Sequence, residues 1–117
     1  MKKYLLERGQ GFMPDYEYRL RYLPKYEDDL NEIIDYITLI LKNPISADRL
    51  VDKIEGSIKE RLNFPLSFEP YQSVKKRKYP YFRIYVDNFT IFYVVIGDIM
   101  EIRRILYSRR DMTPFMK

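Results

Sequence analysis

The stretch from Tyr81 to Asp111 constrains the fold most strongly. It contains three runs of β-branched and aromatic residues separated by two dipeptides, Asp87-Asn88 and Gly97-Asp98. Both dipeptides tolerate the positive φ that a two-residue hairpin turn requires. Runs of this kind joined by such turns predict a three-stranded antiparallel meander, which ends in the basic pair Arg109-Arg110.

A two-residue turn at Asp87-Asn88 sets the register of the first two strands, with Val86 opposite Phe89 and Arg83 opposite Phe92. One face of the sheet then collects apolar side chains that we expect to pack on helices: Phe82, Ile84, Val86, Phe89, Ile91, Tyr93 and Val95. We expect the other face to be open and mixed, with Arg83, Tyr85, Thr90, Phe92 and Val94.

The third strand contains one residue that does not fit this pattern. A turn at Gly97-Asp98 places Arg103 and Tyr107 on the open face, and places on the helix-facing side Met100, Ile102, Arg104 and Leu106. Arg104 is the misfit among these apolar residues. Either it pairs with an acidic residue of the first helix, or a β-bulge shifts the register and exchanges the two arginines.

A strand and two helices are predicted before the meander. The alternation from Glu17 to Tyr22 is typical of a half-buried strand. Pro24 suits the first turn of a helix that we expect to run to Lys42, with the apolar stripe Leu30, Ile33, Ile34, Ile37 and Leu41. After Asn43-Pro44, Ser46 is the predicted N-cap of a second helix, with the stripe Ala47, Leu50, Val51, Ile54, Ile58 and Leu62. The predicted fold class is α+β: an N-terminal strand, an antiparallel helical hairpin and a three-stranded meander.

Composition narrows the classes of function. With 46% hydrophobic residues over 117 positions, the chain suits one domain, which we expect to span residues 17–117 after an N-terminal arm of residues 1–16. The chain contains neither Cys nor His, which excludes thiol chemistry, thiolate or imidazole metal sites and a histidine general base. We expect no metal, no cofactor and no membrane segment, and a cytoplasmic location.

Charge is distributed unevenly along the chain. Residues 1–57 contain 9 basic and 11 acidic residues, a net charge of −2, whereas residues 58–117 contain 12 and 6, a net charge of +6. The run Lys75, Lys76, Arg77 and Lys78 has no acidic residue near it and, with Arg103, is a candidate contact for a phosphate backbone. Charge alone supports nucleic-acid contact and ordinary solvated surface equally.

The order of elements resembles the RelE/ParE superfamily of bacterial toxins from type II toxin–antitoxin systems. The resemblance covers about residues 17–113. Three segments carry it: Tyr22–Leu30, Asn88–Tyr93 and Ile105–Asp111. The last of these has the sequence ILYSRRD and closes the meander. The resemblance implies a helical hairpin packed on one face of an antiparallel sheet. It also implies a cognate antitoxin that wraps the toxin, and growth inhibition when the toxin is free.

The superfamily contains two activities, and the resemblance implies different roles for the residues in each. RelE-like members cleave ribosome-bound mRNA, whereas ParE-like members inhibit DNA gyrase without acting as nucleases. For the nuclease, Arg110 matches an arginine that assists cleavage, and Arg83 lies near a second basic position. Thr90 stands where RelE-like toxins usually have another arginine, and Phe115 is near the position of their C-terminal aromatic residue.

A ribonuclease of this kind must activate the ribose 2′-hydroxyl, stabilise the phosphate charge and protonate the leaving oxygen. The candidate catalytic residues are Arg83, Arg109 and Arg110, which would stabilise charge, and Tyr85 and Tyr107, which would donate a proton or stack. The sequence favours ribosome-dependent mRNA cleavage as the first hypothesis and non-enzymatic inhibition of gyrase as the alternative. A binding module without toxicity is the third.

Overall fold

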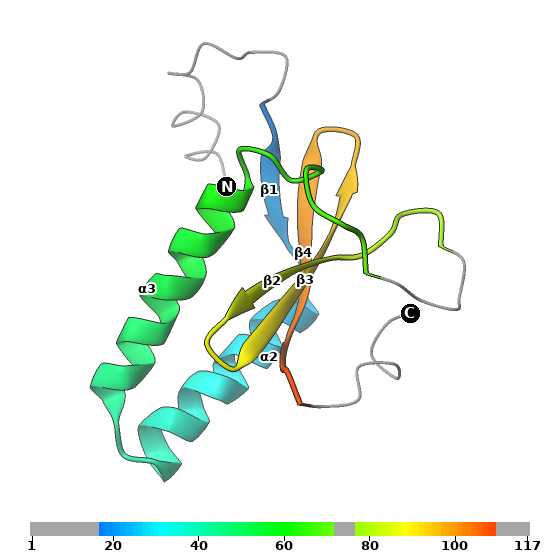
Figure 1. Cartoon of the computed structure of the whole chain (residues 1–117). Coiled ribbons are helices and arrows are strands. Elements are labelled where there is room, and N and C mark those ends of the chain that lie inside the picture. Colours follow the sequence, from blue (N-terminus) through cyan, green and yellow to red (C-terminus); the bar gives the residue numbers. More distant parts are fainter. Residues whose placement is uncertain (1–16, 72–76, 110–117) are drawn as a thin grey trace.

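The structure, a computed structural model, describes residues 17–71 and 77–109 (Figure 1). Its elements follow the predicted order: β1 (Arg19–Tyr22), α2 (Pro24–Asp35), the π-helical segment η2 (Tyr36–Ile40), α3 (Pro44–Arg61), β2 (Phe82–Val86), β3 (Phe89–Ile96) and β4 (Ile99–Tyr107). The predicted α+β class is confirmed. The proposed division between an arm of residues 1–16 and a domain stays a prediction, because the arm lies outside the described residues.

The four strands form one mixed sheet with the order β1-β4-β3-β2. β2 and β3 pair antiparallel, as do β3 and β4, whereas β1 runs parallel to β4, with Leu20 opposite Met100. The N-terminal strand therefore joins the far side of the meander, and β2 forms the opposite edge of the sheet. The described helices include none that is long and apolar enough to cross a membrane.

The helical hairpin differs from its prediction at two places. The first helix does not remain α-helical to Lys42: α2 ends at Asp35 and continues as a wider π-helical turn, after which Lys42 adopts φ 55°. The predicted N-cap at Ser46 is wrong. Asn43 caps α3 instead, because its side-chain oxygen accepts a hydrogen bond from the Ser46 backbone N–H at 3.2 Å, while Pro44 occupies the first turn.

The register of the first hairpin is confirmed, with Val86 opposite Phe89 and Arg83 opposite Phe92 across a turn in which Asp87 has φ 52°. Between β3 and β4 the register shifts, so that Phe92 lies opposite Arg104 while Tyr93 lies opposite Ile102. The pairing expected for Arg104 is confirmed, and the expected bulge is present, but Arg103 still contacts Tyr81 of the second face, so the two arginines are not exchanged. There is a bulge at Arg103, and Arg104 also pairs with Asp29 of the first helix, 2.7 Å from Nε to Oδ2.

The bulge reverses the alternation of every residue after it on β4. Leu106 was predicted on the helix-facing side but is buried in the cluster on the other face, and Tyr107 was predicted on the open face but lies opposite Phe89 on the helix side. Both predictions were wrong for the same reason. One extra residue in a strand moves each later side chain to the opposite face.

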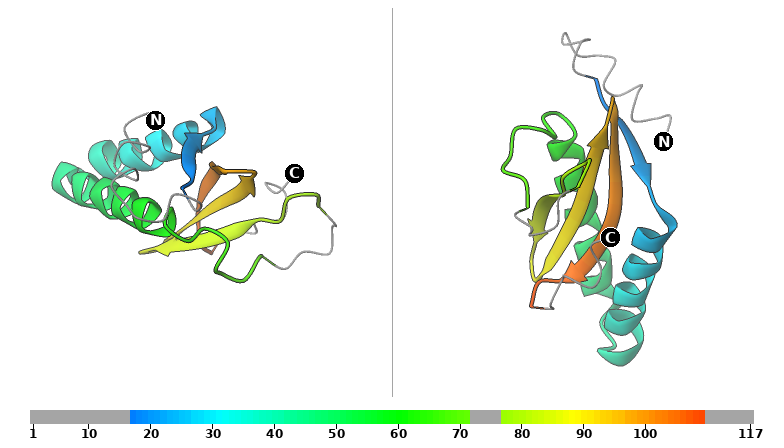
Figure 2. Two further views of the ribbon diagram at one scale, coloured as in Figure 1. Left: turned by 90° about the horizontal axis from the view of Figure 1, so that it is seen from above. Right: turned by 90° about the vertical axis from the view of Figure 1, so that its right-hand side faces the viewer.

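Both helices cover the same face of the sheet (Figures 1 and 2). The core between them contains the side chains predicted for that face, together with residues of β1, α3 and β4: Leu20, Leu50, Ile54, Ile58, Phe82, Ile84, Val86, Ile91, Tyr93, Met100, Ile102 and Ile105. Because these residues are almost fully buried, they account for most of the apolar stabilisation of the fold.

The second face of the sheet is not open as predicted. Phe92 and Val94 are at most 1% exposed and form a small cluster with Tyr81 and Leu106. Tyr71 and Tyr79 of the segment between α3 and β2 pack against this cluster, and the ring of Tyr71 meets that of Phe92 edge-on at 5.7 Å. The segment between the second helix and the meander therefore covers part of the face that was expected to be exposed.

Candidate functional site

The outer edge of β2, which we call the open edge, is the starting point of the candidate site. In a hairpin closed by two residues, alternate residues of the edge strand direct both backbone groups outward. Two hydrogen bonds show which residues these are: Tyr71 N–H donates to the Tyr81 carbonyl at 2.6 Å, and Arg61 Nη1 donates to the Arg83 carbonyl at 2.9 Å. By this alternation, the Tyr85 backbone also faces outward.

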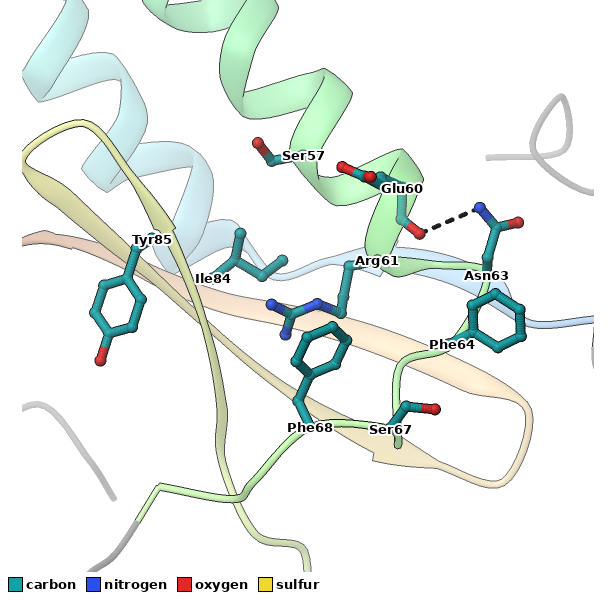
Figure 3. Close-up of a pocket in the computed structure, with 9 residues that line it drawn as sticks. All are labelled: Ser57, Glu60, Arg61, Asn63, Phe64, Ser67, Phe68, Ile84 and Tyr85. Carbon is teal, nitrogen blue, oxygen red and sulfur yellow. Dashed lines mark hydrogen bonds between the residues drawn. The ribbon is translucent and has the colours of Figure 1, made fainter.

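A groove of about 870 Å³ lies beside the open edge, between the C-terminal end of α3, the loop that follows it and β2 (Figure 3). Its walls carry three large apolar side chains that remain well exposed, Phe64 at 63%, Phe68 at 48% and Tyr85 at 63%. Exposed aromatic residues clustered around a groove indicate a surface that contacts a partner.

Arg61 lies in this groove, with its guanidinium over the ring of Phe68 at 3.5 Å from the centroid (Figure 3). Besides the Arg83 carbonyl, Arg61 Nη1 donates to the Tyr93 hydroxyl at 2.9 Å, and that hydroxyl donates to the Pro65 carbonyl at 2.7 Å. Burial raises the pKa of Tyr93 above its ordinary value despite the opposing effect of Arg61, so the hydroxyl stays protonated. None of these partners is a carboxylate.

Arg83 has a similar environment on the second face. Its guanidinium lies 4.9 Å from the ring centroid of Tyr71 and 5.7 Å from that of Tyr85. These cation–π contacts orient the side chain, but within the described part of the chain its guanidinium N–H groups donate to no acceptor. Arg61 and Arg83 thus present positive charge at the open edge, and no carboxylate among residues 17–71 and 77–109 forms an ion pair with either of them.

Of the other predicted catalytic residues, Tyr107 and Arg109 are described, and Tyr107 does not join Arg83 and Tyr85. Tyr107 lies on the opposite face and packs edge-on against Phe89 at 6.0 Å. Arg109 is exposed in the turn after β4, and Arg110 lies outside the described residues. Among the four predicted catalytic residues that the structure describes, it therefore brings together Arg83 and Tyr85.

Thr90, which occupies the position of a RelE-like arginine, is only 3% exposed. Its hydroxyl shares a hydrogen bond with that of Ser108 at 2.8 Å. This contact ties the first hairpin to the end of β4. The residue is therefore part of the packing, not of the exposed surface.

Of the predicted nucleic-acid contacts that the structure describes, Arg77 and Arg103 lie on the same ring, that of Tyr81, at 5.2 Å and 5.8 Å from its centroid. Lys75 and Lys76 lie outside the described residues, whereas Lys78 lies over the ring of Tyr79 at 5.5 Å. Arg103 is held by Glu101, 2.7 Å from Nε to Oε2, and by the Tyr81 hydroxyl. Burial alone would lower the pKa of Arg103. The hydrogen bonds with Tyr81 and Glu101 outweigh burial, so the pKa of Arg103 lies above its ordinary value.

Sequence reasoning missed Arg61, Phe64 and Phe68. It ended the apolar stripe of the second helix at Leu62 and, between that helix and the meander, singled out only the basic run Lys75, Lys76, Arg77 and Lys78. The usable signal was two phenylalanines flanking Pro65 where no periodic element could bury them. Within residues 17–71 and 77–109, no cluster of acidic residues is suited to hold a metal ion.

The sequence matches the model of the ParE toxin of the type II toxin–antitoxin system parDE over residues 20–112. The chain belongs to the ParE toxin family. This match covers most of the chain, so the protein is a toxin of a type II toxin–antitoxin system. A comparison with curated proteins gives no significant match.

Solved structures with the same fold are also toxins of such systems. The chromosomal ParDE system from P. aeruginosa aligns with a TM-score of 0.64 and 22% identity over 80% of this chain and 99% of that one. YafQ from E. coli strain BL21(DE3) aligns with a TM-score of 0.51 and 12% identity, over 86% and 99%. The E. coli DinJ–YafQ toxin–antitoxin complex gives 0.50 and 11%, over 86% and 99%. At these identities the likeness shows the fold alone.

Proposed function

We propose that this toxin inhibits DNA gyrase without cleaving nucleic acid, and that a cognate antitoxin neutralises it. The observation that carries the proposal is the bulge in β4. It turns Tyr107 to the helix side, away from Arg83 and Tyr85. The sequence placed the nuclease first because it expected these three side chains on one face, and the order of the two hypotheses is now reversed.

Cleavage of RNA requires groups that accept and donate protons within hydrogen-bond reach of the reacting atoms. On the described part of the second face, Arg83 and Tyr85 are the predicted catalytic residues that remain. Arginine is always protonated at neutral pH and so stabilises charge without acting as a base. Thr90 is buried and shares a hydrogen bond with Ser108, so its hydroxyl is not offered to a substrate.

Binding to a protein target fits the surface better. The groove and the end of the helical hairpin expose large apolar side chains in two separate groups: Phe64, Leu66, Phe68 and Tyr85 around the groove, and Tyr36, Leu39, Ile40, Leu41 and Ile45 on the hairpin. Exposed apolar groups of this size are typical of protein interfaces. Two such groups allow one toxin to contact both a target and an antitoxin. A toxin that acts on gyrase would work in the cytoplasm.

Ribosome-dependent mRNA cleavage is the second candidate, favoured by the stacking of Arg83 between two tyrosine rings. An arginine interleaved with tyrosines suits a phosphate backbone with unstacked bases. In this case Arg83, Arg109 and Arg110 would stabilise the phosphate, Tyr85 would stack on a base, and the other basic candidates would hold the strand: Lys75, Lys76, Arg77, Lys78 and Arg103.

Two assays on the free toxin separate the candidates. We expect the toxin to inhibit supercoiling by purified gyrase, while primer extension on mRNA from induced cells shows no new cleavage sites. Cleavage within reading frames that disappears in both Arg83→Ala and Arg110→Ala would overturn the proposal in favour of the nuclease. Lys25→Ala, an exposed change at the start of α2, is the control for nonspecific effects of lost charge.

A further inference from the structure

We propose that the tip of the helical hairpin is the surface with which the toxin contacts gyrase, and that it binds an apolar pocket of the enzyme bordered by basic side chains. The hairpin tip consists of the exposed apolar residues between the end of α2 and the first turn of α3: Tyr36, Leu39, Ile40, Leu41 and Ile45. This inference rests on the gyrase target named under the proposed function. It adds the contact surface of the toxin and the chemistry of the complementary surface of the enzyme.

The hairpin tip is an apolar surface of considerable size. Its five side chains are 54–65% exposed and come from one short segment, residues 36–45. In Figures 1 and 2 the link between α2 and α3 lies beyond the end of the sheet. Contiguous apolar side chains that remain exposed in a folded protein indicate a surface that contacts a partner.

The backbone of the hairpin tip has a defined conformation. In the π-helical turn η2, the Leu41 N–H donates to the Tyr36 carbonyl at 3.0 Å, and the Asn43 N–H donates to the Ile37 carbonyl at 3.0 Å. Lys42 then adopts φ 55°, a conformation that is unfavourable for a residue with a side chain. π-helical turns are rare and occur frequently at functional sites. A surface that is already ordered loses less conformational entropy when it binds.

The charge around the hairpin tip is negative. Asp35 lies one turn before Leu39, and Asp48 lies three residues after Ile45, so each exposed carboxylate is on the same side of its helix as the tip. Residues 32–52 contain four acidic and two basic residues, a net charge of −2: Glu32, Asp35, Asp48 and Asp52 against Lys42 and Arg49. An apolar surface with this border is complementary to an apolar pocket bordered by Lys or Arg.

A basic border is what gyrase can supply. The enzyme holds duplex DNA, and proteins bind the phosphates of DNA with Lys and Arg. The apolar group around the groove has the opposite charge, because Phe68 and Tyr85 lie beside the guanidinium groups of Arg61 and Arg83. Basic side chains of the enzyme would repel that group and attract the hairpin tip. Charge therefore favours the hairpin tip as the surface for the target.

A second copy of this chain is a poorer occupant of the hairpin tip. Pairing two tips would bring their carboxylates together, and like charges that face each other across an interface oppose association. The free toxin is therefore expected to leave the hairpin tip exposed.

A matched pair of variants tests the side chains. Leu41 and Leu66 are both 55% exposed, the first at the hairpin tip and the second in the loop after α3. We expect Leu41→Ser to raise the Kd for purified gyrase by about tenfold or more, and Leu66→Ser to change it by about twofold or less. The concentration for half-inhibition of supercoiling should change in parallel. Equal effects of the two variants, or the reverse ranking, would overturn the proposal.

Thermal denaturation checks that both variants remain folded. If Leu41→Ser does not fold, Leu39→Ser takes its place, since Leu39 is 65% exposed at the same tip. The same expected increase in Kd applies to Leu39→Ser, and an unchanged Kd would overturn the proposal in the same way.

The carboxylate border is tested with the double variant Asp35→Asn and Asp48→Asn. We expect it to associate with gyrase about threefold or more slowly at low salt, with a weaker dependence of the rate on salt concentration. Glu69→Gln, which removes an exposed carboxylate from the loop after α3, is the control. A double variant that associates at the rate of the parent protein would contradict the basic border of the pocket.

Amide exchange locates the contact directly. The full-length toxin is compared with and without purified gyrase, and we expect exchange in residues 36–45 to slow in the complex. Protection confined to residues 62–70 and 81–86 would overturn the contact surface. A toxin that neither binds nor inhibits gyrase would overturn the proposed function itself, whereas inhibition that is insensitive to Leu41→Ser would overturn only this inference.

The same variant identifies the other occupants. If Leu41→Ser weakens antitoxin binding and leaves gyrase inhibition unchanged, the antitoxin occupies the hairpin tip and the proposal is wrong. If the free toxin self-associates in sedimentation experiments and Leu41→Ser abolishes this, a second copy occupies the hairpin tip instead.

Discussion

The two edges of the sheet, the β1 and β4 side and the β2 side, differ in how their polar groups are hydrogen-bonded. On the β1 and β4 side, a parallel strand and the start of α2 cover β4, and Asp29 accepts hydrogen bonds from both the Arg104 guanidinium and the Ile105 backbone N–H, the latter at 3.1 Å. On the β2 side, no carboxylate of the described residues pairs with Arg61 or Arg83, and no described strand lies beside the Tyr85 backbone. Within the described structure, the first side therefore satisfies its polar groups more completely than the second.

The difference shows which charged side chains the fold itself depends on. The side chains of Arg104 and Asp29 are only 16% and 12% exposed, and the pair raises the pKa of Arg104 through its hydrogen bonds. Such a pair specifies the register of β4 beyond the bulge, because an unpaired charge at this depth would be costly. The open-edge arginines remain partly accessible to water and need no such partner for the chain to fold.

Removing Asp29 should have the largest effect. Asp29→Ala leaves Arg104 without its carboxylate and the Ile105 N–H without its acceptor, so we expect the free energy of unfolding to fall by about 3–5 kcal/mol. Urea denaturation measures the change. Asp28→Ala, one residue earlier and exposed, is the control, and a loss of equal size there would mean that charge on α2 matters more than this contact.

The second-largest effect is expected at Glu101, which is 4% exposed and lies between Arg21 Nε at 2.9 Å and Arg103 Nε at 2.7 Å. Burial alone would raise the pKa of Glu101, but hydrogen bonds from both arginines outweigh burial and lower it below the usual 4.5. The carboxylate therefore stabilises the fold fully above pH 4.5, and this contribution is lost as pH falls through the lowered pKa.

We expect Glu101→Gln to cost about 2–3 kcal/mol at pH 7, with a smaller difference from the parent protein at acidic pH. Denaturation measured from pH 7 to pH 3 checks both statements. A difference that is constant over this range would show that the contact depends on shape and not on charge.

Loss of the Arg61 guanidinium should cost less, because its acceptors are uncharged. We expect Arg61→Ala to lower the free energy of unfolding by about 1–2 kcal/mol, since the Arg83 carbonyl loses a donor and Phe68 loses its stacking partner. Thermal denaturation measures the loss. A loss as large as that of Asp29→Ala would remove the distinction between the two sides of the sheet.

The smallest effect is expected for the ion pair at the first hairpin turn, between Lys53 and Asp87 at 3.1 Å. Their side chains are 60% and 47% exposed. Lys53→Ala should change the free energy of unfolding by less than about 0.5 kcal/mol. Urea denaturation at low and high salt checks this, and a larger, salt-dependent loss would show that charges near the open edge also hold the fold together.

Some of the candidate site was predictable and some was not. Arg83 and Tyr85 lie side by side on β2, as alternation and the Asp87-Asn88 turn predicted. Tyr107 does not join them because the bulge at Arg103 reverses the alternation of β4, and bulges carry no reliable local signal. The burial of Phe92 and Val94 depends on Tyr71 and Tyr79, which come from a segment without a period of its own.

The sequence by itself determined the order of elements, the helix-facing side of the first two strands of the meander and the register of its first hairpin. These features follow from spacing and turn residues, which act between neighbours in the chain. Only the tertiary structure decided that β1 runs beside β4, that Asp29 is the partner of Arg104, and that Arg61 contacts Phe68 next to the outer edge of β2. These contacts join residues far apart in sequence, and they arise only when packing of the helices on the sheet brings their polar groups together.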